Sequence, residues 1–140
     1  MRFQEVHPER TLLVELAFDE SLSGELLSLA EAADLDTAWV LGTGALRDAE
    51  LGIYDQDDYA LETVQYDEPL EMPLFAATLA TAGEAPFVQV QAVLARPSGQ
   101  ALAGRVTDAT VFGGEALVWG FEESIPRETD AATGMDRFSQ

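Results

Sequence analysis

The sequence predicts a single α+β domain in which one helix accompanies many β-strands. Only the segment Leu22–Ala33 carries apolar residues at helical spacing, whereas most later segments alternate apolar and polar residues or carry short apolar runs between turns. Helices therefore do not alternate with strands, as they do in parallel βαβ folds. The 140 residues fit one domain over 1–140, with a core at about 10–123 and a polar tail, 124–140, that packs back on it.

The first elements are predicted from alternation and from capping residues. Thr11–Phe18 places its apolar residues on one face, which is typical of a half-buried strand. Asp19 or Ser21 is suited to cap the helix that follows. Ala38–Gly42 is then expected to form a short buried strand, which its own last glycine and Gly44 close as a turn.

The rest of the chain predicts strands joined by turns. The turn at Asp55–Asp58 separates two strand-like segments and indicates a hairpin. Pro73 places its strand at a sheet edge or at a bulge, and Gly113-Gly114 is expected to turn the chain. The strands expected here are Ala49–Tyr54, Tyr59–Tyr66, Leu70–Thr78, Phe87–Ala95, Ala103–Val106, Ala109–Phe112 and Glu115–Phe121.

Charge is the strongest signal in the composition. The chain has 26 acidic residues against seven basic ones, a net charge of −19, and every basic residue is arginine. Such a surface suits concentrated salt, where the Debye length falls to about 3 Å at 1 M and repulsion between carboxylates is screened. We therefore expect a halophilic source; an acidic protein from a lysine-poor genome is the alternative. The same charge disfavours binding to nucleic acid, which requires a basic stripe.

The absence of cysteine excludes disulfides, thiolate metal ligands and a cysteine nucleophile. The first residues, Met1–Glu5, show no signal peptide. No apolar stretch is long enough to span a bilayer. We therefore expect a cytoplasmic protein without membrane association.

Six segments, taken in order, carry a family likeness. They are Gly42-Thr43-Gly44-Ala45-Leu46, Leu51-Gly52-Ile53-Tyr54-Asp55, Glu71 after Pro69-Leu70, Pro86-Phe87-Val88-Gln89-Val90-Gln91, Ala103-Gly104-Arg105-Val106 and Arg127–Gly134. Over roughly residues 10–135 this pattern resembles the PPC family, the plant-and-prokaryote domain. The matching family stretches are G-x-G-A-L, L-G-x-Y-D, a glutamate that begins a strand, P-F-x-H-x-H, G-G-H-L and R-x-x-D-x-x-T-G.

The resemblance implies a largely antiparallel sheet of about seven strands flanked by helices, and assembly as a homotrimer. In plants the PPC domain follows a basic AT-hook that enters the DNA minor groove, and it serves trimerisation and partner binding. Prokaryotic relatives usually lack the hook and are often called DNA-binding by analogy. Three histidines hold a metal in some of them.

This chain departs from the family at those histidines. Gln89 and Gln91 stand two residues apart, on one face of their strand, and Arg105 stands at the third position. Carboxamides are weak ligands for a transition metal and a permanent cation repels one, so we expect no metal and no cofactor. Two interpretations stay open. The trio forms a donor-rich pocket for a carboxylate or phosphate, or its members satisfy one another and nearby carboxylates such as Glu71.

Other candidate residues carry weaker signals. His7, the only histidine, is expected at the surface without a partner nearby in sequence. Gly42-x-Gly44 lacks the third glycine of a dinucleotide site. The turn Asp55–Asp58 lacks the glycine and glutamate of an EF-hand loop.

The sequence thus favours a non-enzymatic, PPC-like homotrimeric scaffold that binds a protein partner or a small anion. One alternative, by family analogy, is a DNA-associated transcriptional regulator, although the chain alone is not expected to bind DNA at a charge of −19. The other is an enzyme that acts on an anionic metabolite. Its site residues would be Arg105, Gln89, Gln91 and Glu71. Fold likeness alone does not choose among these functions.

Overall fold

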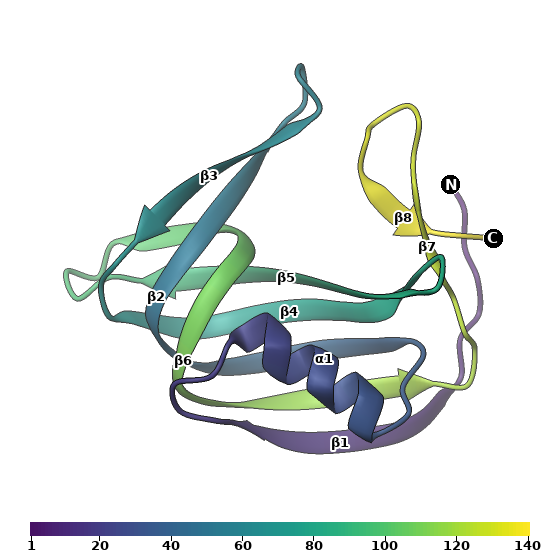
Figure 1. Cartoon of the computed structure of the whole chain (residues 1–140), viewed down its shortest axis with the longest axis horizontal. Helices are drawn as coiled ribbons and strands as arrows, with labels where there is room; N and C mark the ends of the chain where they lie inside the picture. The colour runs from purple at the N-terminus through teal and green to yellow at the C-terminus, as the bar shows by residue number, and fades with distance from the viewer.

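The computed structural model describes all residues from Met1 to Gln140 and contains one helix and eight strands in a single sheet (Figure 1). In chain order the elements are β1 (Pro8–Leu16), α1 (Leu22–Ala32), β2 (Ala38–Asp55), β3 (Ala60–Tyr66), β4 (Leu70–Ala82), β5 (Ala85–Ala95), β6 (Ala101–Phe121), β7 (Arg127–Thr129) and β8 (Asp136–Phe138). The fold is mostly sheet with one short helix, in keeping with the α+β class. The expected count of about seven strands and the flanking helices are corrected: the polar tail adds the short strands β7 and β8, which no alternation pattern indicates.

Two strands are much longer than the sequence predicted. β2 runs through both Ala38–Gly42 and Ala49–Tyr54, and β6 joins three predicted strands through Gly113 and Gly114. The glycines expected to form turns, Gly42 with Gly44 and Gly113 with Gly114, lie inside these two strands and do not turn the chain. Gly44 lies opposite Gly114, and a Cβ at Gly44 would collide with the carbonyl oxygen of Gly113. The glycines therefore let β2 and β6 approach closely, while shifts of register bend both strands.

The strand pairings close on themselves. β2 pairs with β6, β6 with β5, β5 with β4, and β4 returns to β2, all antiparallel. β1 pairs with the last part of β6, and β3 pairs with the end of β2. A register shift between Glu71 and Leu74 sets Pro73 at a bulge, one of the two places predicted for it. The closed pairing gives the sheet an inner face and an outer face.

The inner face and the helix form the core. α1 lies across the strands in Figure 1, and its Leu22 and Leu26 are fully buried in the same cluster as the inner face. Ser21, one of the two expected caps, begins the helix because its Oγ accepts a hydrogen bond from the Gly24 amide at 3.2 Å. The helix has 11 residues, and no helix of the structure is long and apolar enough to cross a membrane. The largest fully buried inner-face side chains are Val40, Leu46, Met72, Phe75, Leu79, Val90, Leu94, Val111 and Val118.

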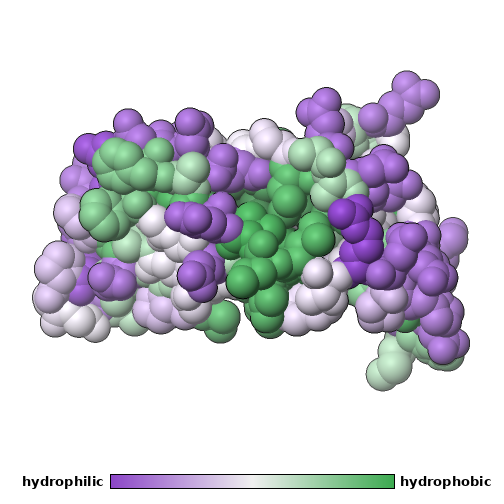
Figure 2. Space-filling view, turned by 90° about the horizontal axis from the view of Figure 1, so that it is seen from below, coloured by the Kyte–Doolittle hydropathy of each residue, from purple (hydrophilic) through white to green (hydrophobic).

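The outer face carries large apolar side chains that are exposed in the single chain. Leu13 of β1, Leu117 of β6 and Leu41 of β2 are direct cross-strand neighbours, and the row continues through Ala76 to Gln91. Directly opposed residues point to the same side of a sheet, so this row shares one face. Figure 2 shows one side of the molecule on which apolar side chains gather in the middle, between polar ends. The large exposed apolar residues of the outer face are Leu13 (75%), Trp39 (46%), Leu41 (39%), Leu74 (50%), Val93 (42%) and Leu117 (43%).

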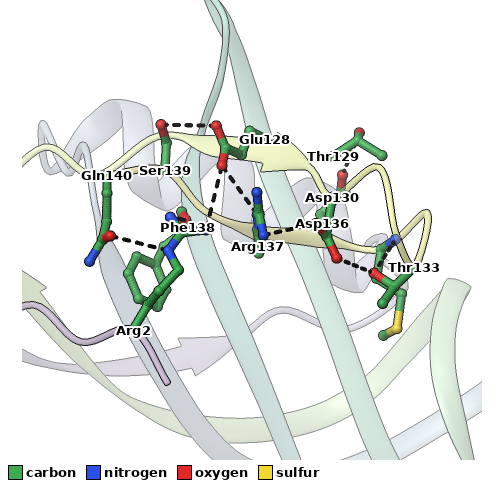
Figure 3. Close-up of polar contacts among 11 residues, drawn as sticks. Arg2, Glu128, Thr129, Asp130, Thr133, Asp136, Arg137, Phe138, Ser139 and Gln140 are labelled. Carbon is green, nitrogen blue, oxygen red and sulfur yellow. Dashed lines mark hydrogen bonds and ion pairs between the residues drawn. The ribbon is translucent and has the colours of Figure 1, made fainter.

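The tail forms a small hairpin that brings the two ends of the chain together. β7 pairs in parallel with β4 and antiparallel with β8. Arg137 of β8 contacts Glu128 at 3.1 Å and Asp130 at 2.8 Å, and Arg2 donates to the carbonyl oxygen of Phe138 at 3.1 Å (Figure 3). Arg137 thus joins the two strands of the hairpin, and Arg2 joins β8 to the N-terminal segment.

Candidate functional site

The two glutamines and Arg105 lie together on the outer face. Gln91 of β5 is directly opposite Arg105 of β6, and Gln89 is opposite Thr78 of β4. Gln89 and Arg105 are half-buried, and Gln91 is exposed. Because successive residues of a strand point to opposite faces, both glutamines lie on the side away from buried Val90. The structure thus brings together three of the residues that the sequence singled out.

Two hollows of the surface meet at Gln91. The first, which we call the amide hollow, has a volume of about 210 Å³ and is lined by Trp39, Ala76, Ala77, Thr78, Gln89, Gln91 and Arg127. The second, the Arg105 hollow, has a volume of about 450 Å³ and is lined among others by Tyr54, Leu74, Gln91, Val93, Arg105 and Met135. Gln91 therefore borders two arginine-containing hollows, one with Arg127 and one with Arg105.

Glu71 lies apart from this group. It begins β4, opposite Ala95 of β5, and lines a separate hollow that also contains Arg47. The residue of β4 that faces Gln91 is Ala76, five residues further along the strand and thus about 16 Å away. The structure does not bring Glu71 to Arg105.

Arg105 and Arg127 differ from every other arginine of the chain in lacking a polar partner. Arg10 donates to the carbonyl oxygen of Ala33. The arginines that pair with carboxylates are Arg2, Arg47, Arg96 and Arg137. No hydrogen bond joins Gln89, Gln91 and Arg105 to one another. In a chain with 26 acidic residues, two unpaired arginines beside two glutamines leave their donors available to a ligand.

Arg127 is the member of the site that sequence reasoning missed. Its Nε is shielded from water and has no hydrogen-bond partner, and its guanidinium lies 5.6 Å from the centre of the Phe87 ring. Burial lowers the pKa of Arg127 below its usual value, and nearby Asp136 opposes that shift. The sequence held one signal for it, since Arg127 opens the tail segment that resembles the family pattern R-x-x-D-x-x-T-G.

The chemistry of this group suits an anion. A guanidinium binds a carboxylate or phosphate through two parallel hydrogen bonds, and a carboxamide adds a further donor. Gln89, Gln91 and Arg105 stand where the family that the sequence resembles carries histidines. These three residues do not fit a metal, because they include no imidazole and one permanent cation.

His7 has a partner that only the fold reveals. Its ring contacts the carboxylate of Glu123, and its backbone amide donates to the same side chain at 2.9 Å. Glu122 lies beside them. The atoms of His7, Glu122 and Glu123 that could bind a metal ion lie within 4.8 Å of one another. The His7 ring and Glu122 are exposed, as expected of a surface histidine.

The contact with Glu123 raises the pKa of His7 above 6.5, mainly through the side-chain hydrogen bond. A histidine whose pKa is higher in the folded state stabilises that state at low pH, and its contribution is lost as pH rises through the folded-state pKa. We expect NMR titration of the imidazole to give a pKa above 6.5, and Glu123→Gln to move it back toward that value. An unchanged pKa in the variant would contradict the assignment.

The family model described as the Plants and Prokaryotes Conserved (PCC) domain matches residues 3–121. The chain belongs to this family. The resemblance drawn from its six sequence segments, under the name PPC, is thereby confirmed. No curated protein matches this PCC domain.

Solved structures share its fold. A metal-containing protein of Archaeoglobus fulgidus superposes with a TM-score of 0.93 at 24% identity, over 100% of both chains. The PPC protein of Pyrococcus horikoshii superposes with a TM-score of 0.92 at 18% identity, over 100% of this chain and 98% of that chain. A Bacteroides thetaiotaomicron protein with a provisional DNA-binding name gives 0.85 at 17% identity, over 96% of each. At these identities the likeness establishes the fold of the PCC domain and no activity.

Proposed function

We propose that this PCC domain is a non-enzymatic homotrimeric scaffold that binds a small anion beside Gln89 and Gln91. The observation that carries the proposal is the pair of arginines without partners, Arg105 and Arg127, in the two hollows that these glutamines border. Glu71, the carboxylate considered for an enzymatic role, lines a different hollow.

The outer face supports the assembly. Its six large apolar residues are 39–75% exposed in the single chain, and a continuous apolar surface of this kind is typical of a subunit interface. Second and third copies of the chain suit it because each brings the same apolar face. Gln91 and Arg105 continue the same cross-strand row, so the proposed anion site borders the interface.

We expect light scattering in molar KCl to give about three times the chain mass of 15.1 kDa. Leu41→Asp should lower the mass to that of a monomer, because it places a charge in the apolar interface. Val64→Asp is the matched control, since Val64 is also exposed but pairs with Leu51 of the inner face. A wild-type monomer at micromolar concentrations would refute the trimer.

For the anion, we expect phosphate, citrate or a small carboxylate to bind wild type in calorimetric titrations. Arg105→Ala and Arg127→Ala should each weaken binding by about tenfold, as expected when a charge-assisted hydrogen bond is lost. Arg47→Ala is the control, because Arg47 already pairs with Asp19 at 2.5 Å. If all three variants bind the anion as wild type does, the two unpaired arginines have only a structural role.

Two related proteins carry names that suggest other ligands. DNA binding, the provisional name of the Bacteroides protein, is unfavourable for this chain because its net charge of −19 repels phosphates. The A. fulgidus protein contains a metal, whereas we propose an anion here because Arg105 stands beside two carboxamides. A DNA-associated role would therefore require a partner protein.

A further inference from the structure

Another cavity lies between the N-terminal segment, the start of β2 and the tail. Its volume of about 290 Å³ is at the small end of the roughly 300–1,000 Å³ typical of ligand pockets. We call it the apolar pocket after its main lining side chains, Phe3, Val6, Trp39, Phe121, Ile125 and Phe138. This size favours a ligand with a single ring or a short branched chain over a nucleotide.

Arg127 is the cation of the apolar pocket that lacks a polar partner. Arg2, the other cation in the lining, already donates hydrogen bonds to the tail at 3.2 and 3.1 Å. The Oγ1 of Thr37 accepts the backbone amide of Ile125 at 2.8 Å. The Nε of Arg127, by contrast, is shielded from water and makes no hydrogen bond. A buried donor without an acceptor is costly, and a bound anion would remove that cost.

We infer that the apolar pocket binds a small monocarboxylate with an aromatic or branched apolar body. The carboxylate accepts hydrogen bonds from Arg127, and the body contacts the apolar lining. A phosphate dianion fits poorly, because the apolar walls cannot hydrate its second charge. The nearby carboxylate of Asp136 and the chain's negative charge likewise disfavour a second anionic group on the ligand.

This pocket is separate from the site of the proposed anion, although the two share a wall. Trp39, Thr78 and Arg127 line both the apolar pocket and the amide hollow. Phe3 lines only the apolar pocket, and Gln89 lines only the amide hollow. Variants at these two positions therefore separate the two sites.

The probe is benzoate, with benzamide as its uncharged counterpart and inorganic phosphate as the ligand of the neighbouring site, each titrated by calorimetry. We expect benzoate to bind wild type and benzamide not to bind measurably. Arg127→Ala should weaken benzoate by about tenfold or more, and Phe3→Ala by about threefold through lost apolar contact. Gln89→Ala should leave benzoate binding unchanged.

Three results would overturn the inference: no benzoate binding at millimolar concentration, equal binding of benzamide, or a Phe3→Ala variant that binds as wild type does. Phe3 is 84% exposed, so its truncation leaves the fold intact even where Arg127→Ala proves unstable. A failure of the proposed function would give a different result. Phosphate would then not bind, or it would bind equally well to wild type, Gln89→Ala and Arg105→Ala.

Discussion

The melting temperature of this PCC domain is expected to rise steadily from low salt to molar KCl. None of its 26 acidic side chains is buried, and only four of them, Asp19, Glu68, Glu128 and Asp130, pair with an arginine. Repulsion among the other carboxylates is stronger in the compact state than in the unfolded chain, and salt screens it. A gain of about 3 kcal/mol would raise the Tm by roughly 10 °C.

The shape of the salt dependence identifies its cause. Screening of the carboxylates changes most below a few tenths molar, so the rise in Tm should be steepest there and continue more gently toward molar KCl. The triple variant Glu9→Lys, Glu62→Lys, Glu84→Lys tests the same point, because these exposed carboxylates make no hydrogen bond or ion pair with a side chain. Its Tm should be higher than that of wild type in low salt and similar in molar KCl. A flat wild-type midpoint would show that the acidic surface has another origin than salt adaptation.

Alternation predicted where strands lie but not where they end. The segments from Ala49 to Phe121 are nearly all β, as expected, because period-2 patterning reports directly on a two-faced sheet. Glycine was the misleading residue. Gly44 and Gly113 look like turn residues, yet in the structure they lie inside the long strands β2 and β6. Gly44 is needed because the backbone of β6 lies too close for a Cβ at that position. A single sequence does not show which strand is the partner of β2.

The sequence likewise predicted only some of the residues of the candidate site. Gln89, Gln91 and Arg105 were found because they lie on strands whose family resemblance is strong. Arg127 could not be placed, since its position depends on the parallel pairing of β7 with β4, and the polar tail shows no alternation that would predict a strand there. Glu71 was grouped with Arg105 because of its family position and its charge, and the length of β4 keeps the two apart.

Gly44→Ala is expected to destabilise the fold severely, whereas Gly113→Ala is not. A Cβ at position 44 would collide with the carbonyl oxygen of Gly113 and approach the Cα of Gly114 to 2.8 Å. Both obstacles are backbone atoms of β6, which cannot rotate away as a side chain can, so β2 and β6 must separate. Overpacking of this kind costs about 3 kcal/mol or more. A Cβ at Gly113 meets nothing within 4 Å, and its effect should stay within about 0.5 kcal/mol.

Urea unfolding at a fixed molar KCl concentration measures both variants against wild type. A lower midpoint for Gly44→Ala with an unchanged slope indicates lost stability in a fold of the same compactness. Gly44 pairs with Gly114 and Gly113 pairs with Ala45, so the two substitutions add the same methyl group at one crossing of β2 and β6. Only the direction of the added methyl group differs. Equal midpoints would therefore mean that the close approach at Gly44 does not exist and that the two long strands pair in another register.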